Sequence, residues 1–325
     1  MKKHFKKLLL MALMAVMAVG LIACGTDKSD NESTKEEKTS VTITSLDASK
    51  NEIELEVPYN PKRIAILDLA SLDIIDELGV GDRVVGMAST SIDYLEKYSN
   101  DASIKNLGTI KEADLEAVME CEPDIIFIGG RLSKSYDALS EIAPVVYLAT
   151  DTNEGLVNSV SKNAKTIASI FGMEDKVDSL MSDFGARIDA IKKISSGKTA
   201  LVGMTTSGSF NLLGNDGRCS LIGVEAGFNN LTAVGSTSTH GNESSFETVV
   251  QQNPDYIFVM DRDSAISTAG AKTAKEIVEN ELVKTTDAYK NNHIIYLEHS
   301  NVWYTAEGGI QALDIMLKDL EKGLK

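Results

Sequence analysis

The chain has 325 residues, with 32 basic and 48 acidic side chains and a formal charge of −16. A surface this acidic repels phosphate backbones, so nucleic acid is excluded as a partner. About 280 residues remain after the N-terminal segments described next, which is enough for two domains of ordinary size.

Residues 1–23 have the features of a secretory signal peptide. They start with lysines, continue in an apolar run too short to span a bilayer comfortably, and end in small residues before Cys24. The ending LIAC resembles the bacterial lipobox, so we expect Cys24 to be lipidated; the alternative is an ordinary signal peptide with an incidental cysteine. Without residues 1–23, which hold four lysines and no acid, the chain keeps 28 basic and 48 acidic side chains, a formal charge of −20.

The segment after the signal is predicted to be a flexible tether over 24–45. Residues 25–40 contain no Ile, Leu, Val or aromatic residue and cannot form a core. Contact with the membrane is therefore expected through the lipid anchor only. Cys121 and Cys219 are the other cysteines; they form no CxxC or zinc-binding spacing, and we expect two buried thiols.

Short apolar runs that alternate with helical periodicity predict an α/β protein of two Rossmann-like lobes with central parallel sheets. The N-terminal lobe is predicted over 46–153, a long helical linker broken near Gly172 over 154–195, and the C-terminal lobe over 196–325. In the C-terminal lobe we expect one helix at 271–290 and a last helix at 305–322.

One unit of helix, proline turn and strand occurs twice, 131 positions apart. The pairs are Glu116 and Glu247, Pro123 and Pro254, Asp124 and Asp255, Phe127 and Phe258, and Arg131 and Arg262. Ligands of open parallel sheets bind beyond the carboxyl ends of the strands, where both copies end in arginine. The repeat therefore predicts two guanidiniums on opposite walls of one cleft.

Arg218, in the turn NDGR after another strand-like segment, is a third candidate. Only six of the 32 basic residues are arginines, so three at strand ends indicate a site for a multiply charged, planar or oxygen-rich anion. The alternative is that each arginine neutralises a nearby carboxylate, above all Arg262, which lies between Asp261 and Asp263.

The sequence from 45 to 325 resembles the substrate-binding lipoproteins of ABC importers for iron–siderophores, in particular the catecholate branch. The resemblance rests on the order and spacing of VPYNPKRIAIL from Val57, DLEAVMECEPDIIFIGGR from Asp114, GNDGR from Gly214, the segment 240–263 and NVWYTAEGG from Asn301. It implies a class III fold, in which two lobes bridged by a helix close only modestly.

The resemblance also implies roles for individual residues. Arg131, Arg218 and Arg262 would contact catecholate oxygens, while His240 and Tyr304 would ligate Fe(III) when a siderophore supplies four of six donors; Trp303 would lie beside the ligand. Hard ferric iron suits such oxygen donors. The alternatives are a solvated His240, a Tyr304–Trp303 packing pair, and His299 as the rival imidazole. His293 is expected to be structural.

Glu116 and Glu247 occupy matched helices, one in each lobe. The resemblance implies that they contact arginines of the membrane permease. Alternatively, both are ordinary acids at helix starts, favoured by the helix dipole.

These features predict a receptor that captures a ferric catecholate siderophore and delivers it to ABC permease subunits. We expect a monomer that has no intrinsic cofactor and is anchored outside the cytoplasm. It should catalyse no reaction, since serine-hydrolase, phosphate-loop and HExxH motifs are missing. A Gram-positive cell surface is favoured, although a periplasmic lipoprotein would look similar. A haem or cobalamin receptor is the alternative; a receptor for bare zinc or manganese fits less well, because the histidines are scattered.

Overall fold

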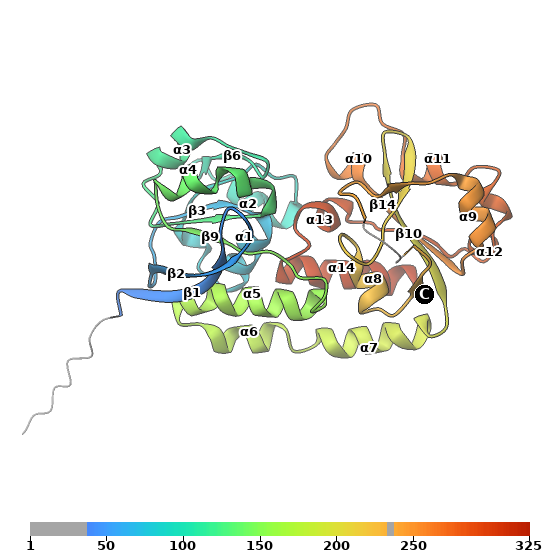
Figure 1. Cartoon of the computed structure of the whole chain (residues 1–325), viewed down its shortest axis with the longest axis horizontal. Coiled ribbons are helices and arrows are strands. Elements are labelled where there is room, and N and C mark those ends of the chain that lie inside the picture. Colours follow the sequence, from blue (N-terminus) through green and yellow to red (C-terminus); the bar gives the residue numbers. More distant parts are fainter. Residues whose placement is uncertain (1–37, 233–236) are drawn as a thin grey trace, which may run out of the picture. The chain divides into compact units, whose positions relative to one another are not determined.

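The computed structural model describes residues 38–232 and 237–325, and Lys38–Lys325 form one compact unit (Figure 1). The predicted signal peptide, Cys24 and most of the predicted tether lie outside the described residues. Among the helices of the described ranges, none has the length and apolar character needed to cross a bilayer.

The compact unit begins earlier than the sequence indicated. Residues 40–45, predicted as tether, belong to strand β1 (Ser40–Leu46), which pairs antiparallel with β2 (Glu52–Pro58). Thr42 and Thr44 are exposed while Ile43 and Ser45 are buried, which is the alternation of a strand with one covered face. The Ser45 hydroxyl accepts a hydrogen bond from the Tyr147 N–H at 3.0 Å and fastens the hairpin to the N-terminal lobe.

The N-terminal lobe holds a five-stranded parallel sheet in the order β5-β4-β3-β8-β9. Every residue of the two central strands is buried, because helices cover both faces. The strands are β3 (Ile64–Leu67), β4 (Val84–Met87), β5 (Lys105–Asn106), β8 (Ile125–Ile128) and β9 (Val145–Tyr147). The helices are α1 (Leu69–Glu77), α2 (Glu96–Ser99), α3 (Leu115–Glu120) and α4 (Tyr136–Ser140).

Three helices connect the lobes: α5 (Leu156–Phe171), α6 (Glu174–Leu180) and α7 (Phe184–Ser195) (Figure 1). The predicted break occurs at Gly172, which ends α5 in the left-handed conformation with φ 66°. A second break, between α6 and α7, was not predicted. The connection is thus three helices rather than one kinked helix.

The C-terminal lobe has a mixed sheet in the order β13-β11-β10-β14-β15, with β12 also paired to β10. Its centre is parallel as predicted, but β11 pairs antiparallel with both β10 and β13, because a tight turn folds β11 directly back on β10. The strands are β10 (Thr199–Thr206), β11 (Ser209–Leu212), β12 (Asn229–Asn230), β13 (Asn242–Glu243), β14 (Tyr256–Asp261) and β15 (Ile294–Tyr296).

The helices of this lobe are shorter than predicted. Residues 271–290 form α11 (Ala274–Val278) and α12 (Asp287–Lys290) with a 3-10 turn between them, and glycines at 308 and 309 divide the last helix into α13 (Ser300–Thr305) and α14 (Ile310–Gly323). The remaining helices are α8 (Ser220–Val224), α9 (Phe246–Gln252) and α10 (Arg262–Ala265). Cys121 and Cys219 are buried free thiols, as expected.

The two lobes share one continuous hydrophobic core that includes side chains of α1, α5, α14 and both central sheets. In addition, a carboxylate from each lobe caps the start of a helix that begins in or next to the other lobe. Asp73 of α1 accepts hydrogen bonds from Gln311 N and Ala312 N, both at 2.9 Å, and Glu225 after α8 accepts one from Val157 N at 2.6 Å. These buried caps oppose a large relative movement of the lobes.

Candidate ligand-binding site

The sequence repeat corresponds to a repeat of structure. Asp114 and Ser245, which are 131 positions apart, are the N-caps of α3 and α9. Glu122 and Asn253 after these helices both have positive φ, 43° and 38°. The two copies therefore enter their strands, β8 and β14, through the same backbone turn.

The matched aspartates connect each copy to the sheet. Asp124 accepts hydrogen bonds from the N–H groups of Lys62 and Arg63 at 2.7 and 2.9 Å, just before β3. Asp255 accepts one from Thr199 N at 2.8 Å, at the start of β10. Each carboxylate aligns its strand with the neighbouring parallel strand, so the carboxyl ends of the two central strands are fixed in space.

Arg131 and Arg262 follow those carboxyl ends, as predicted, and converge on Tyr304 of α13. The guanidinium carbons lie 5.4 and 6.0 Å from the centre of the Tyr304 ring. Arg131 Nη2 also donates to the Tyr304 carbonyl oxygen at 3.1 Å. The two half-buried guanidiniums, one from each lobe, thus meet at one aromatic ring.

Arg218 reaches the same ring by a different path. Its guanidinium carbon lies 4.5 Å from the centre of the Tyr304 ring, and Nη1 donates to the Thr239 carbonyl at 2.8 Å. The argument from parallel strand ends does not apply to it, because β11 is antiparallel to β10. The loop between β11 and α8 brings it to the site instead.

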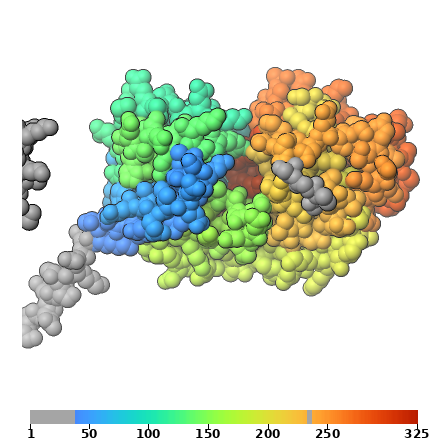
Figure 2. Space-filling view, in the orientation of Figure 1, coloured from blue at the N-terminus to red at the C-terminus, as the bar shows by residue number. Residues whose placement is uncertain are grey.

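A cavity of ≈ 700 Å³ lies between the lobes at this point. Figure 2 shows the hollow, with the dark red C-terminal segment at its floor. Its lining includes Asp68, Arg131, Arg218, Thr239, Tyr304 and Glu307. The lining mixes polar and apolar side chains, and it carries both guanidinium and carboxyl groups.

The three guanidiniums change the acidity of Tyr304. Burial alone would raise the pKa of the phenol, but the hydrogen bond from Arg262 and the charges of Arg218, Arg262 and Arg131 together lower it. A phenol of lowered pKa is readily converted to a phenolate, which is a good ligand for a hard cation such as ferric iron.

Arg262 is partly neutralised by a carboxylate of the protein itself, which is the alternative considered for the arginines. It forms an ion pair with the buried Asp263 at 3.0 Å, and its buried Nε has no hydrogen-bond partner within the described residues. Arg131 forms no ion pair with any described residue. Burial and the charge of Arg218 lower the pKa of Arg131, so this guanidinium is held where a negative charge would stabilise it.

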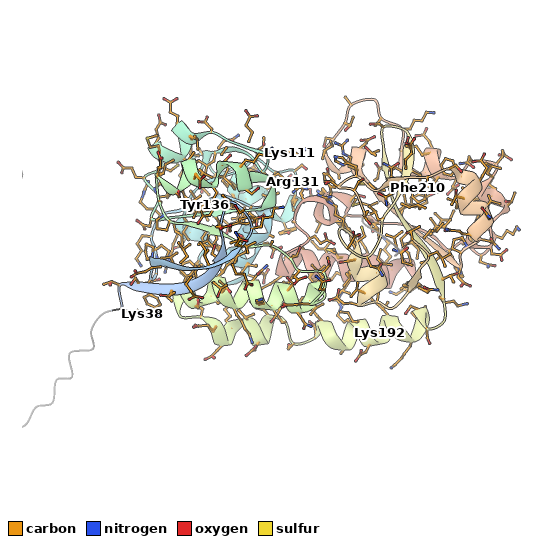
Figure 3. All side chains as sticks on the ribbon, in the orientation of Figure 1. Lys38, Lys111, Arg131, Tyr136, Lys192 and Phe210 are labelled. Atoms are coloured by element: carbon orange, nitrogen blue, oxygen red, sulfur yellow. The ribbon has the colours of Figure 1, made fainter. Side chains whose placement is uncertain are left out.

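His240 lies on an exposed turn of the C-terminal lobe, and its carbonyl accepts a hydrogen bond from Asn211 at 2.8 Å. Partial burial and the charges of Arg262, Arg218, Lys111 and Arg131 lower the pKa of its imidazole. A lower pKa keeps the ring neutral at physiological pH, which metal ligation requires. Lys111, a cation missed in the sequence, lies with Arg131 on the side of the N-terminal lobe facing the C-terminal lobe (Figure 3).

The structure corrects the expectation for Trp303. Its side chain is fully buried, does not line the cavity, and donates its indole N–H to Asp319 at 2.9 Å. His299 also bonds Asp319, at 2.7 Å, and is likewise outside the cavity lining. His293 stacks on Tyr256 with 4.2 Å between ring centres, in agreement with a structural role.

Glu116 and Glu247 are exposed in the first turns of α3 and α9. Beside Glu116, the side chains of Leu115 and Met119 are 37% and 59% exposed. The surface around Glu116 therefore exposes more apolar area than is usual for a helix that faces only solvent.

Two carboxyl groups of the cavity were also missed in the sequence. Asp68 is the N-cap of α1, and Glu307 follows α13. Asp68 stands directly after the strand β3, a position where the strand-end argument could have found it. Glu307 has no comparable signal, because only the fold brings it to Arg218.

Two α/β lobes with a charged interlobe cavity and a helical connection define a solute-binding protein that presents a fixed site to its ligand. The periplasmic binding protein family model matches residues 64–300, and the chain belongs to this family, a non-enzymatic solute-binding class.

Several relatives of known specificity are similar over nearly the whole chain. The petrobactin-binding protein YclQ of Bacillus subtilis is 36% identical over 330 residues, which cover 98% of this chain and 99% of the relative. The ferric-anguibactin-binding protein FatB of Vibrio anguillarum is 26% identical over 82% of this chain and 84% of its own.

Solved structures agree with this assignment. The crystal structure of YclQ superimposes with a TM-score of 0.81 and covers 88% of this chain and 99% of its own. The catecholate-siderophore-binding protein VctP of Vibrio cholerae has a TM-score of 0.78 and 31% identity, with coverage of 87% and 100%.

Proposed function

We propose that this chain is the receptor of an ABC importer for a ferric siderophore, and that the siderophore presents catecholate oxygens. The observation that carries the proposal is the convergence of Arg131, Arg218 and Arg262 on Tyr304, whose side chain lines the interlobe cavity together with Arg131 and Arg218. The names of YclQ, FatB and VctP, which refer to petrobactin, anguibactin and catecholate siderophores, support it.

The chemistry of the site suits this ligand. An iron–tris-catecholate carries several negative charges spread over oxygens and aromatic rings. Guanidiniums donate charge-assisted hydrogen bonds to such oxygens and stack on the rings. Contacts of about 1.5–3 kcal/mol for each charged hydrogen bond and about 1–2 kcal/mol for each desolvated cation–π contact are sufficient for submicromolar affinity.

Iron ligation by the protein is the finer part of the proposal. Tyr304, with its lowered pKa, and His240, held neutral, would complete the ferric coordination shell when the siderophore supplies only four donors. A siderophore with six donors would bind through the arginines alone. The protein would thus accept both kinds of ligand in one cavity.

Anchoring and delivery complete the proposed function. Lipidation at Cys24 would hold the receptor outside the cytoplasm, and the name of the 28% identical lipoprotein YfiY of Bacillus subtilis supports this. Glu116 and Glu247, one on each lobe, would contact the permease.

The test is a calorimetric titration of the purified protein with a panel of ferric catecholates, ferric hydroxamates, haem and cobalamin, with a visible absorption spectrum recorded for each mixture. We expect submicromolar binding of ferric catecholates and a shift of the visible charge-transfer band for a four-donor catecholate. A Soret band with haem, or binding of cobalamin that is indifferent to Arg131, would replace this proposal by the corresponding alternative.

A further inference from the structure

Each of the three guanidiniums has a carboxyl group near it. Asp263 pairs with Arg262 at 3.0 Å, and the charge of Asp68 acts on Arg131. Glu307 is the carboxyl that Arg218 acts on. If all six groups are ionised, the centre of the site is close to neutral, and a trianionic ligand would add three uncompensated negative charges beside buried carboxylates.

Two of the three carboxyl groups have structural roles that fix them. Asp263 accepts hydrogen bonds from Ser207 N at 2.6 Å and from Arg262. Asp68 caps α1 and accepts two hydrogen bonds from Ser71, at 2.9 and 2.8 Å. Protonation of either carboxylate would weaken several of these contacts.

Glu307 is different. It lies in the cavity wall, and Oε1 accepts a single backbone hydrogen bond, from Cys219 N at 2.9 Å. A protonated carboxyl can keep that bond through its carbonyl oxygen. Burial raises the pKa of Glu307 to about 7, although the Cys219 N–H and the charge of Arg218 lower it in part. The charged and titratable groups around it are Arg131, Arg218, Cys219, Glu225 and Tyr304, with Asp68, Asp73 and Asp216 nearby on neighbouring elements.

We propose that Glu307 takes up a proton from solvent when a multiply charged anion enters the cavity, and that this residue thereby sets the net charge the site accepts. The inference rests on the proposed function. In this step the carboxylate and one proton become the neutral acid, and no bond of the ligand changes. Arg218 and Arg131 are then released from an internal anion and are available to the ligand.

The sign of the pH dependence follows. Below pH 7 Glu307 is already protonated and the anion binds without added cost, whereas above pH 7 binding must draw a proton from solvent. If bound Glu307 remains protonated through pH 8, the affinity falls about tenfold between pH 6 and pH 8. A monoanionic bis-catecholate should show a smaller fall, because it raises the pKa of Glu307 less.

The experiment uses ferric enterobactin, a six-donor tris-catecholate, so that the protein need not supply an iron ligand. Calorimetric titrations at pH 7.4, in buffers with different ionisation enthalpies, measure the protons taken up per ligand bound. Titrations at pH 6 and pH 8 give the change in Kd. The variant is Glu307→Gln, whose amide oxygen can still accept the Cys219 N–H, and the control is Glu298→Gln, which removes an exposed carboxylate paired with Lys322.

We expect wild type and Glu298→Gln to take up about 0.7 proton at pH 7.4, because a carboxyl of pKa about 7 is ionised to about that extent there, and to weaken about tenfold from pH 6 to pH 8. Glu307→Gln should take up none, keep nearly constant affinity and bind more tightly than wild type at pH 8. Normal binding of the wild type with no buffer dependence would overturn this inference alone, even if the variant failed to fold. Failure of the wild type to bind any ferric catecholate would overturn the proposed function as well.

Discussion

The two copies of the repeated unit end in the same residue but leave it in different states. Arg262 of the C-terminal lobe is held by the buried carboxylate of Asp263, and the Tyr304 and Asp263 hydrogen bonds raise its pKa. Arg131 of the N-terminal lobe has no such ion pair among the described residues, and its pKa is lowered. The repeat thus fixes the position of the guanidinium, while the residue next to it decides how freely that guanidinium can bind a ligand.

Removal of the Arg131 guanidinium should have the largest effect on binding. We expect Arg131→Gln to lose about 2–3 kcal/mol of binding free energy, about 30- to 150-fold in Kd for a ferric catecholate. The thermal midpoint should change by no more than about 2 °C, because no ion pair is broken. Calorimetric titration and thermal unfolding measure the two quantities, and a large loss of stability would show that Arg131 is structural.

The matched change at Arg262 should divide its effect between binding and stability. Arg262→Gln leaves Asp263 buried without its charged partner, at a cost of about 1–3 kcal/mol in the free energy of unfolding. The loss of ligand affinity should be about tenfold, smaller than for Arg131. The double variant Arg262→Gln with Asp263→Asn is the control: it should recover part of the stability and none of the affinity. Equal affinity losses for Arg131→Gln and Arg262→Gln would contradict the distinction between the lobes.

An effect that is confined to one class of ligand, and that leaves stability unchanged, is expected where the two arginines meet. Tyr304→Phe keeps the ring for the cation–π contacts and removes only the phenol oxygen. A four-donor ferric catecholate should then bind about tenfold more weakly and lose its charge-transfer shift, whereas a six-donor ligand should bind as before. His240→Ala should lose the shift in the same way, and His299→Ala is the control, because the His299 ring bonds Asp319 whereas the three arginines act on His240. Unchanged spectra in both variants would leave only an arginine site.

Much of this site follows from the sequence, for a physical reason. Helix, turn and strand each have a local signal, and a parallel sheet brings the residues that follow its strands to one edge. The positions of Arg131 and Arg262 could therefore be predicted from the sequence. The hairpin β1–β2 was missed because its first strand alternates small polar residues with single apolar ones, a weak signal beside a polar segment.

Other features depend on how the chain packs and have no local signal. Trp303 and Tyr304 are adjacent in sequence, but successive residues of an α-helix point about 100° apart, so only one of them can face the cavity. The structure has Tyr304 in the lining and Trp303 in the core. The same holds for Glu307, since only the packing of the loop before α8 against α13 brings Cys219 N and Arg218 to it.

The surfaces of the two lobes offer a last comparison, with no expected effect on ligand binding. Glu116→Ala and Glu247→Ala should leave Kd unchanged, because both carboxylates are exposed and away from the cavity lining. Import of iron-labelled siderophore, in cells that carry the chain's own permease, should fall in both variants. We expect the smaller loss for Glu116→Ala, because the exposed Leu115 and Met119 remain in that variant and keep apolar area in the contact.

Glu174→Ala is the matched control for this comparison, since Glu174 is another exposed acid in the first turn of a helix, α6. If it lowers import as much as the other two variants, the three acids act only through helix stability, as the helix-dipole alternative holds. If import is normal in all three, the permease contacts lie elsewhere. A loss confined to Glu116 and Glu247 would mean that the repeated unit has two binding roles. The residues after its strands would contact the ligand, and the residues at the starts of its helices would contact the importer.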